Sequence, residues 1–464
     1  MSERRYFGTD GVRGVAGRHP MTASFALGLG VATAELLKAA GKARPSVVIG
    51  MDTRRSGPML ALALGAGLTS RGADVTDLGV VPTPAVSYLT RALGADAGIV
   101  VSASHNPFDD NGIKVFNSAG EKLDDDLEAE LEDLVERVWL NGEAEPVVGA
   151  GLGRYRRLPR EGGERRASDS YAAHLLANAP YLDGMKVVVD CANGAGHLLA
   201  PRIFAKIGAR LEVMNARPDG ENINVGCGST SPEAVLRRVV EGGFDVGVTF
   251  DGDADRALLV DRRGRLVTGD HIMAICAVER GEREIVATHM SNLGMETYLR
   301  ERGIGVRRVK VGDRYVYEEL KRSGLTLGGE QSGHVLFLDK APTGDGILTA
   351  LQLLAAVRKS GRALEEWMDE IPVYPQELVN VAVPAEVKAD VSDAPEVAAA
   401  VREAQDRLGD AGRVLIRPSG TEPLVRVMVE GPDHAAVRSV AQSVAEAVRR
   451  AGGAATAAEA ADPA

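Results

Sequence analysis

Three aspartates alternate in the segment Asp251-Gly-Asp253-Ala-Asp255, directly after the apolar run at residues 246–250. This run predicts a buried β-strand, so the three carboxylates are expected at the carboxyl end of that strand. Like charges at this spacing repel one another strongly unless a cation lies among them. Carboxylate oxygens suit Mg²⁺ or a similar hard ion. The segment therefore predicts a divalent-metal site and a metal-dependent enzyme.

Two other interpretations of this segment are weaker. An EF-hand loop requires Gly at its sixth position and Glu at its twelfth, where this sequence has Arg256 and Arg262. A solvated acidic turn is disfavoured by the buried strand that precedes it. Arg256 either neutralises the carboxylates or points outward to bind a substrate phosphate, and the residues alone leave both roles open.

A serine-containing loop, residues 102–107 (Ser-Ala-Ser-His-Asn-Pro), follows the apolar run at residues 97–101. A serine at a strand end, among backbone N–H groups, can act as a nucleophile or accept a phosphoryl group, although Ser, Asn and Pro are also common in turns. A serine-hydrolase dyad is not expected, because the G-x-S-x-G motif is absent and adjacent side chains of a strand point to opposite faces. Lys114, in the next short strand-like run, either reaches the same site or is solvated.

Three more segments carry polar groups suited to ligand binding. Residues 329–334 (Gly-Glu-Gln-Ser-Gly-His) offer the mixture of side chains that suits a polyhydroxylated ring. Residues 417–422 (Arg-Pro-Ser-Gly-Thr-Glu), together with Arg426, form a candidate anion site, for which a plain hairpin turn is the alternative. Residues 6–14 are glycine-rich and contain Arg13, but they match neither a Walker nor a Rossmann pattern.

Composition limits the class of protein. A chain of 464 residues with 45% apolar and only 4% aromatic residues predicts two to four domains with cores mainly of Ala, Val and Leu. The net charge of −11 argues against a general binder of nucleic acid or anionic membranes. The start of the chain lacks the apolar segment of a signal peptide, and no stretch is apolar enough to span a bilayer. The odd number and wide spacing of Cys191, Cys227 and Cys276 predict reduced thiols in the cytosol.

Strand-like runs alternate with Ala- and Leu-rich helical segments, which predicts an α/β architecture. Six of these runs end in polar or glycine-rich loops: residues 46–50, 97–101, 186–189, 246–250, 284–288 and 324–327. They form three pairs, which predicts three related α/β units. We place domains at residues 1–153, 154–257, 258–371 and 372–450. The fourth is a smaller α+β domain with a strand pair at residues 413–416 and 424–429, followed by a disordered tail at residues 451–464.

Together these loops resemble the motifs of the α-D-phosphohexomutase superfamily, in five segments between residues 6 and 426. Residues 7–14 (FGTDGVRG), 311–316 (VGDRYV) and 329–334 (GEQSGH) are most similar to members that act on glucosamine phosphates. Members that act on mannose or glucose phosphates usually have a His after the Gly in the first of these loops, and Met or Glu at the position of Gln331. Pro418 replaces the more common Lys.

The resemblance implies three α/β domains with mixed sheets and a smaller α+β C-terminal domain around a central cleft. It implies an intramolecular phosphotransferase that interconverts glucosamine 6-phosphate and glucosamine 1-phosphate and supplies UDP-N-acetylglucosamine synthesis. Mannose or glucose phosphates are the alternative substrates. A phosphoserine enzyme, one Mg²⁺ per chain and glucosamine 1,6-bisphosphate as intermediate are implied as well. The partner is a phosphosugar rather than nucleic acid or membrane, and a homodimer is one assembly that the family allows.

The same resemblance assigns roles to residues. Ser104 would carry the phosphoryl group, and its phosphate would complete a metal site made by Asp251, Asp253 and Asp255. The reacting end would be lined by three cations: Arg13, Lys114 and Arg256. The sugar would be bound by residues of two loops: Asp313, Arg314, Glu330, Ser332 and His334. The distal phosphate would be bound in the fourth domain: Arg417, Ser419, Gly420, Thr421 and Arg426. Either Lys114 or His334 would serve as the base.

Two other classes of function are compatible with the residues. A metal-dependent phosphatase would use Asp251 as its nucleophile, since Asp-x-Asp after a strand also occurs in enzymes with an aspartyl phosphate. A non-catalytic phosphosugar sensor would bind its ligand without turnover and without need of Ser104.

Overall fold

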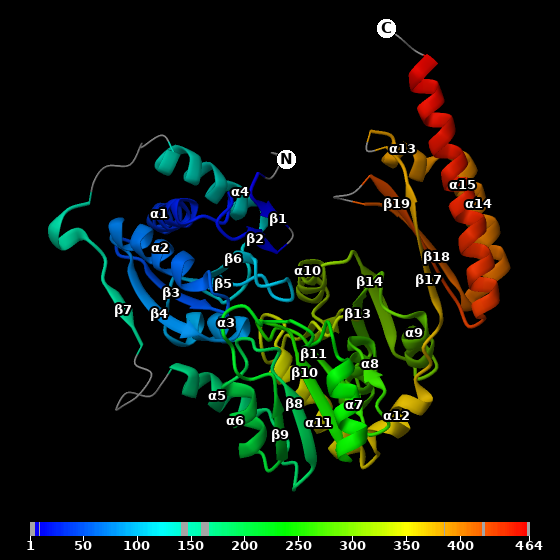
Figure 1. The fold of residues 1–464 in the computed structure, drawn as a ribbon, viewed down its shortest axis with the longest axis horizontal. Coiled ribbons are helices and arrows are strands. Elements are labelled where there is room, and N and C mark those ends of the chain that lie inside the picture. The colour runs from blue at the N-terminus through cyan, green and yellow to red at the C-terminus, as the bar shows by residue number, and fades with distance from the viewer. Residues whose placement is uncertain are drawn as a thin grey trace. The chain divides into compact units, whose positions relative to one another are not determined.

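The computed structural model describes residues 5–8, 10–140, 147–158, 167–384, 386–419 and 423–461 (Figure 1). The chain divides into a large unit, Met1–Met290 with Ile304–Met368, and a C-terminal unit, Ser291–Gly303 with Asp369–Ala464. Among the described residues, the large unit holds three β-sheets and the C-terminal unit holds one. None of the described helices combines the length and the hydropathy needed to cross a membrane.

The first sheet has the strand order β1-β2-β6-β5-β3-β4-β7. Its strands are β1 (Phe7–Gly8), β2 (Gly11–Val15), β3 (Ser46–Met51), β4 (Asp74–Val80), β5 (Ala97–Val101), β6 (Asp110–Asn117) and β7 (Tyr155–Arg157). Its helices are α1 (Ala23–Ala39), α2 (Gly57–Ser70), α3 (Thr83–Ala92) and α4 (Asp125–Leu134), the last continued by a π-helix (Val135–Leu140). A short 3₁₀-helix (Gly149–Gly151) precedes β7, which pairs in parallel with β4 at the edge of the sheet.

The second sheet has the order β12-β11-β10-β8-β9, and the third has the order β14-β13-β15-β16. The strands of the second sheet are β8 (Lys186–Asp190), β9 (Arg210–Met214), β10 (Val246–Phe250), β11 (Ala257–Asp261) and β12 (Leu266–Val267). Those of the third are β13 (Glu284–Thr288), β14 (Gly305–Val309), β15 (Leu327–Gly329) and β16 (Val335–Phe337). The helices of these two domains are α5 (Ala167–Ala177), α6 (Leu199–Lys206), α7 (Glu233–Gly242), α8 (Gly269–Arg280), α10 (Asp313–Ser323) and α11 (Gly346–Ser360).

The three sheets repeat one arrangement of four strands, as the pairs of apolar runs predicted. The four strands are β3–β6 in the first sheet, β8–β11 in the second and β13–β16 in the third. Within each set, the first strand pairs in parallel with the second on one side and with the third on the other. The fourth strand of the set then pairs antiparallel with the third. Buried strands such as β5, β10 and β11 are covered on both faces, which explains their continuous apolar sequence.

Small residues let the helices of the first domain approach closely. A Cβ atom on Gly30 of α1 would lie 2.3 Å from the carbonyl oxygen of Leu64, and one on Gly67 of α2 would lie 2.1 Å from that of Leu27. The residues buried around this contact are mainly Ala, Val and Leu. Close helix packing therefore builds this core with few aromatic side chains.

The C-terminal unit is an antiparallel sheet covered by helices. Its sheet has the order β17-β19-β18, with β17 (Gln376–Ala382), β18 (Arg413–Pro418) and β19 (Leu424–Glu430). Its helices are α9 (Leu293–Arg300), α13 (Lys388–Asp393), α14 (Pro395–Leu408) and α15 (His434–Ala461), with a short 3₁₀-helix (Gly409–Ala411). Helix α12 (Leu364–Glu370) leads into it along the chain. Its core is rich in valine.

Two boundaries differ from those expected. The second sheet continues past residue 257, because β11 returns antiparallel to β10 after the aspartate segment. The prediction of a disordered tail from residue 451 is wrong for most of that segment, because α15 continues through Ala461. Alanine is the best helix former, so an Ala-rich segment that follows a docked helix extends it.

Candidate active site

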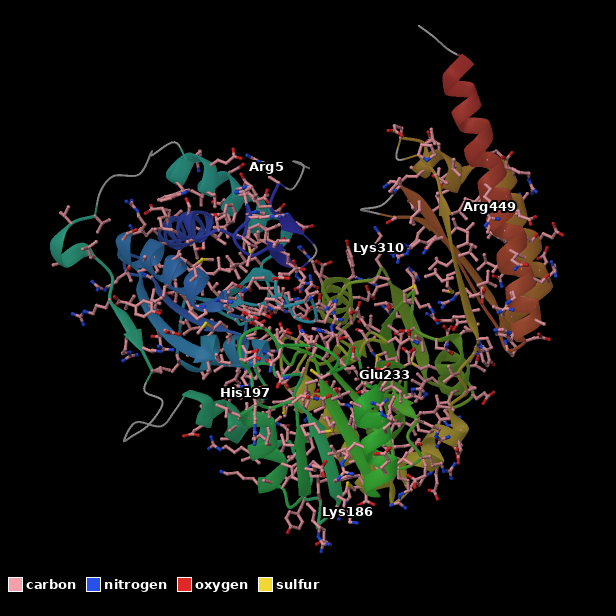
Figure 2. The ribbon with its side chains drawn as sticks, viewed as in Figure 1. Arg5, Lys186, His197, Glu233, Lys310 and Arg449 are labelled. Atoms are coloured by element: carbon pink, nitrogen blue, oxygen red, sulfur yellow. The ribbon has the colours of Figure 1, made fainter. Side chains whose placement is uncertain are left out.

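The loops that follow β5 and β10, and the loop between β15 and β16, come together in the large unit. Ser104 follows β5, Asp251 follows β10, and His334 precedes β16. Lys114 lies within β6, the neighbour of β5 in the first sheet. One buried cluster therefore contains residues of all three sheets. Lys186, the first residue of β8, marks the other end of the second sheet at the lower edge of Figure 2.

The three aspartates form the centre of this cluster. One ligand oxygen from each of Asp251, Asp253 and Asp255 can be chosen so that all lie within 4.8 Å of one another, and all three residues are buried. Burial and the two neighbouring carboxylates raise the pKa of Asp251 well above its usual range. Among the described residues, Asp253 Oδ1 and Asp255 Oδ1 have no hydrogen-bond partner. Buried, unpaired carboxylate oxygens are the donor set that one hard divalent cation requires, so the residues fit a metal ion.

Ser104 lies directly beside this metal site. Its Oγ donates a hydrogen bond of 2.5 Å to Asp251 Oδ2. Its backbone has φ of 53°, in the left-handed region that non-glycine residues rarely adopt. Its N–H donates to Ser102 Oγ at 2.9 Å, and the Ser102 hydroxyl donates to Asp52 Oδ2 at 2.6 Å. The predicted phosphate acceptor is thus held in a strained conformation at the edge of the aspartate cluster.

Lys114 is the buried cation of the cluster. Its Nζ lies 3.3 Å from Asp253 Oδ2, 3.6 Å from Asp255 Oδ2 and 3.0 Å from Asp10 Oδ2. Burial alone would lower the pKa of Lys114, but these three carboxylates raise it above its usual value. Arg13 joins the same group through an ion pair with Asp10. The structure therefore brings Arg13 and Lys114, two of the three predicted cations, to the aspartate cluster.

His334 lies between two carboxylates. Its Nδ1 is 3.6 Å from Asp255 Oδ1, and its Nε2 is 3.3 Å from Asp313 Oδ2. Burial lowers the pKa of His334, but Asp255 and Asp313 more than offset that effect and raise it. Asp313 is the first residue of α10, so the third domain contributes a second residue to the cluster. The predicted role of Asp313 in substrate binding stays a prediction.

The other predicted substrate-binding residues of the large unit lie around this centre. The backbone N–H of Arg256 donates to Asp251 Oδ1 at 3.2 Å, and the Arg256 side chain is partly exposed. Glu330 accepts from the Gly312 N–H at 3.0 Å and from the Ser332 hydroxyl at 3.4 Å. Arg314 lines a small pocket with Lys114 and Lys122. Its guanidinium forms ion pairs with three acidic side chains: Asp125, Glu128 and Glu318.

Lys122 is a functional candidate that the sequence did not reveal. Its Nζ lies 2.5 Å from Asp10 Oδ1 and also pairs with Asp313 Oδ2. These carboxylates more than offset burial and raise the pKa of Lys122 to about 12. Through Asp313 it is connected to His334, and through Asp10 to Lys114. A single lysine after a strand carries no local signal, so only the fold shows this role.

Other contacts to the site come from residues that the motifs did not include. Thr83, at the start of α3, donates through its hydroxyl to Asp253 Oδ2 at 2.7 Å. Arg54 and Asn224 both donate to the backbone of the Ser104 loop. Like Lys122, these residues reach the site from segments without a recognisable motif.

The predicted distal phosphate site lies in the C-terminal unit. Arg417 and Arg426 are directly opposite each other on β18 and β19. Burial and the charge of Arg426 lower the pKa of Arg417. Ser419 is buried, and its backbone carbonyl accepts from Lys388 Nζ at 2.5 Å. Gly420 and Thr421 lie outside the described residues. Two facing arginines beside a buried serine suit an anion.

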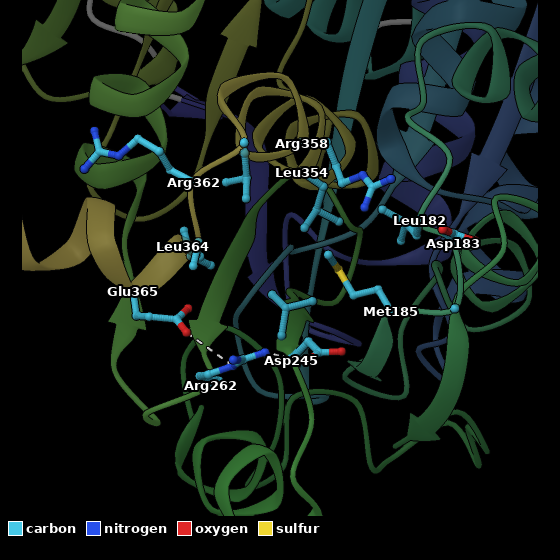
Figure 3. Close-up of a pocket in the computed structure, with 15 residues that line it drawn as sticks. Leu182, Asp183, Met185, Asp245, Arg262, Leu354, Arg358, Arg362, Leu364 and Glu365 are labelled. Atoms are coloured by element: carbon cyan, nitrogen blue, oxygen red, sulfur yellow. Dashed lines mark hydrogen bonds and ion pairs between the residues drawn. The ribbon is translucent and has the colours of Figure 1, made fainter.

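A separate cavity of about 470 Å³ lies at the other end of the second sheet (Figure 3). It is lined in part by Met185, Asp245 and Val246, near the amino ends of β8 and β10, and none of the predicted site residues lines it. Arg262 pairs there with Asp245 at 2.7 Å and with Glu365 at 3.2 Å. Ligands of α/β sheets bind at the carboxyl ends of the strands, so this cavity is not the catalytic site.

The fold and the site define an α/β enzyme with a buried serine, a metal site and paired cations. The chain belongs to the phosphoglucomutase/phosphomannomutase family, as its resemblance to the α-D-phosphohexomutases predicted. Its sequence matches α/β/α domain I of that family at residues 4–140, domain II at residues 169–264 and domain III at residues 268–374. The C-terminal domain matches at residues 378–447.

Relatives match over almost the whole chain. A protein named phosphoglucosamine mutase from Deinococcus radiodurans is 50% identical, over 98% of this chain and 100% of the relative. Another of that name from Thermus thermophilus is 51% identical, over 96% and 98%. A solved structure of a phosphoglucomutase/phosphomannomutase family protein from Burkholderia thailandensis has 25% identity and a TM-score of 0.79, over 96% of this chain and 97% of that one.

Proposed function

We propose that this protein interconverts glucosamine 6-phosphate and glucosamine 1-phosphate, the reaction of a phosphoglucosamine mutase. The observation that carries this proposal is the hydrogen bond from Ser104 to Asp251 at the metal site. A phosphoryl group on this hydroxyl would contact the cation that the aspartates would hold. The relatives named phosphoglucosamine mutase support the choice of an amino sugar phosphate as substrate.

In the first transfer, the phosphoryl group on Ser104 moves to the sugar. The anomeric hydroxyl of glucosamine 6-phosphate attacks phosphorus, the new O1–P bond forms, and the bond between phosphorus and Ser104 Oγ breaks. The hydroxyl proton passes to a base of the cluster, and Ser104 Oγ takes up a proton. Of the two candidate bases, Lys114 and His334, His334 fits better, because the raised pKa of Lys114 keeps that side chain charged. The product is glucosamine 1,6-bisphosphate.

In the second transfer, the bisphosphate has turned so that its 6-phosphate faces Ser104. The serine hydroxyl loses its proton and attacks that phosphate, and the O6–P bond breaks. The sugar O6 takes up a proton, glucosamine 1-phosphate leaves, and the phosphoserine is restored. The net reaction is an isomerisation, so no external phosphate donor is consumed in a cycle.

The charges of the cluster stabilise both transfers. Mg²⁺ held by Asp251, Asp253 and Asp255 would neutralise negative charge on the transferred group. Lys114, Arg13 and Arg256 add positive charge near its oxygens without moving during the reaction. Arg417, Ser419 and Arg426, with Gly420 and Thr421, would bind the phosphate that is not reacting. That site must accept the 6-phosphate and the 1-phosphate in turn.

The test is an assay of the purified protein with Mg²⁺, glucosamine 1,6-bisphosphate and glucosamine 6-phosphate, with intact-mass analysis and peptide mapping of the phosphorylated residue. We expect glucosamine 1-phosphate as product and phosphate on Ser104. Phosphate on Asp251 with release of inorganic phosphate would indicate a phosphatase. Binding without turnover would indicate a sensor. Comparison of kcat/KM for glucosamine, glucose and mannose phosphates decides the substrate, and a higher value for either neutral sugar would overturn the choice of an amino sugar.

A further inference from the structure

The backbone of the Ser104 loop is held by two side chains from two different sheets. Arg54 follows β3 of the first sheet, and Asn224 lies between β9 and α7 of the second. Arg54 Nη2 donates to the carbonyl oxygens of Ser104 and Asn106, both at 2.9 Å. Asn224 Nδ2 donates to the same two oxygens, at 2.9 and 3.2 Å. Each carbonyl oxygen therefore accepts from both side chains.

Arg54 is anchored for this role. It is 1% exposed, and its Nε donates to Asp52 Oδ2 at 2.8 Å. Its Nη1 donates to the carbonyl oxygens of Asp110, at 3.0 Å, and Pro107. A guanidinium is buried only where carboxylates and carbonyls satisfy its donors. Here four of its five oxygen partners belong to the backbone of residues 104–110, so the donors of Arg54 serve mainly that loop.

The loop needs such support because its conformation is unfavourable by itself. Ser104 has φ of 53°, which costs free energy for any residue with a Cβ atom. The metal loop also approaches the same carbonyl, since a Cβ atom on Gly252 would lie 2.6 Å from the Ser104 oxygen. Arg54 and Asn224 fix the peptide plane after Ser104 through its carbonyl oxygen, and the bond from the Ser104 N–H to Ser102 Oγ fixes the plane before it. Together these bonds fix the direction of the Ser104 side chain.

We propose that Arg54 and Asn224 are positioning residues that together hold Ser104 Oγ, and the phosphoryl group it carries, at the aspartate cluster. The proposal rests on the proposed function for the phosphoryl group, and on geometry alone for the hydroxyl. Neither residue is assigned a contact with the transferred group. Their effect is on the geometry of transfer, where a displacement of about 1 Å can lower the rate by roughly 100-fold.

Asn224→Ala is the first test, because Asn224 is only partly buried and its loss leaves no buried charge. We expect kcat to decrease by about 10- to 100-fold with KM within about 2-fold of wild type. Asn224→Asp keeps the size but replaces the donor by an acceptor, so it should be at least as impaired as the alanine variant. Asn222→Ala is the matched control, because Asn222 lies in the same loop but donates only locally, to the Arg217 carbonyl oxygen.

A second pair of variants tests Arg54. Arg54→Lys keeps the charge but cannot bond several carbonyls in a fork, so kcat should decrease by about 10-fold or more. Arg55→Met is its control, because the Arg55 side chain is 76% exposed and pairs with Glu221, outside the loop. If Arg54→Lys does not fold, the Asn224 variants still decide the matter.

Hydrogen exchange gives a readout that does not depend on turnover. Amides of residues 104–106 should exchange roughly 10-fold faster in Asn224→Ala than in wild type, and at the wild-type rate in Asn222→Ala. Unchanged exchange together with an unchanged kcat would overturn the proposal. Absence of turnover or of phosphoserine in the wild-type protein would overturn the proposed function instead. The exchange result would still test whether Arg54 and Asn224 fix the backbone of the Ser104 loop.

Discussion

The hydroxyl of Ser104 donates a 2.5 Å hydrogen bond to the carboxylate of Asp251, across 147 positions of sequence. The two residues follow central strands of different sheets, β5 and β10. Their contact joins the group that would carry the phosphoryl to the group that would bind the metal. Substitutions of these two residues and their neighbours should therefore show which groups affect the covalent chemistry, which affect metal binding and which affect stability.

Replacing Ser104 should abolish turnover without unfolding the protein. Ser104→Ala removes the oxygen that forms the covalent intermediate, so we expect a decrease in activity of at least about 1000-fold. Ser104→Gly should be equally inactive but more stable than the alanine variant by roughly 1 kcal/mol, because glycine relieves the positive φ. Thermal unfolding and the mutase assay check both. Measurable turnover in clean Ser104→Ala protein would contradict the covalent mechanism.

Metal affinity should depend on the phosphorylation of Ser104. A phosphate on this serine adds an oxygen ligand beside Asp251, so the phosphorylated protein should bind Mg²⁺ about 10-fold more tightly than the unphosphorylated protein. Titration calorimetry of the two forms measures this without turnover. Asp253→Asn should weaken binding in both forms, which serves as the control. Equal affinities of the two wild-type forms would show that the phosphate is not a ligand.

Lys122→Met should impair both catalysis and stability. The change leaves Asp10 and Asp313 without their shared cation, and Asp313 lies 3.3 Å from His334 Nε2. Since loss of one partner of a buried pair typically costs about 3–5 kcal/mol, we expect kcat/KM to decrease at least about 10-fold, with a lower melting temperature.

Lys321→Met is the matched control for Lys122. Lys321, on α10, pairs with Glu121 at 3.0 Å, just before Lys122 in the chain, but its side chain is 53% exposed and does not touch Asp10 or Asp313. An exposed pair contributes little, so activity should remain within about 2-fold. Equal losses in Lys122→Met and Lys321→Met would mean that Lys122 acts only by holding α10 in place.

The buried carboxyl of Asp345 should make stability depend on pH. Burial raises the pKa of Asp345 from 3.8 to about 6. The fold therefore favours the protonated form, and this contribution is present below about pH 4 and is lost as pH rises through about 6. Asp345→Asn keeps one oxygen to accept from the Leu348 N–H, which lies 2.9 Å from Asp345 Oδ1. Its NH2 group can donate to the Tyr171 hydroxyl oxygen, which lies 2.6 Å from Asp345 Oδ2.

Asp345→Asn should therefore be more stable than wild type at pH 7.5, by roughly 1–3 kcal/mol, and about equal to it at pH 4. Chemical unfolding across this pH range measures the difference. Asp124→Asn, at the exposed N-terminus of α4, is the control and should show no such change. A wild-type protein that is more stable than Asp345→Asn at pH 7.5 would contradict the prediction.

Arg426→Met should stabilise the protein while weakening substrate binding. Like charges directly opposite on neighbouring strands cost about 0.2–1 kcal/mol, and Arg426 faces Arg417 in this way. Loss of one arginine should raise the free energy of unfolding by that amount and raise KM at least about 10-fold. Arg402→Met, on the exposed surface of α14, is the control. An unchanged KM would exclude Arg426 from phosphate binding.

Strands buried on both faces were predicted best. The apolar runs at residues 246–250 and 284–288 coincide with β10 and β13, because a continuous apolar run has no stable place on a surface. The half-exposed edge strands β9 and β14 were not predicted, because neither contains a continuous apolar run. The sequence of β14, Gly-Val-Arg-Arg-Val, also lacks alternation, and that of β9, Arg-Leu-Glu-Val-Met, alternates over only four residues. The domain boundaries as a whole stay a prediction.

The sequence by itself determined which groups can do chemistry, because a strand followed by Ser104 or by three aspartates is a local pattern. The tertiary structure decided which groups act together. Lys122 and Asn224 carry no local signal, and Arg54 carries only that of a polar loop after a strand. Each acquires its partners only when separate strands and loops meet. Hydrogen bonds at the site join residues that are far apart in the chain. Arg54 and Asn224, for example, both donate to the carbonyl oxygen of Ser104. Only packing of the sheets sets those distances.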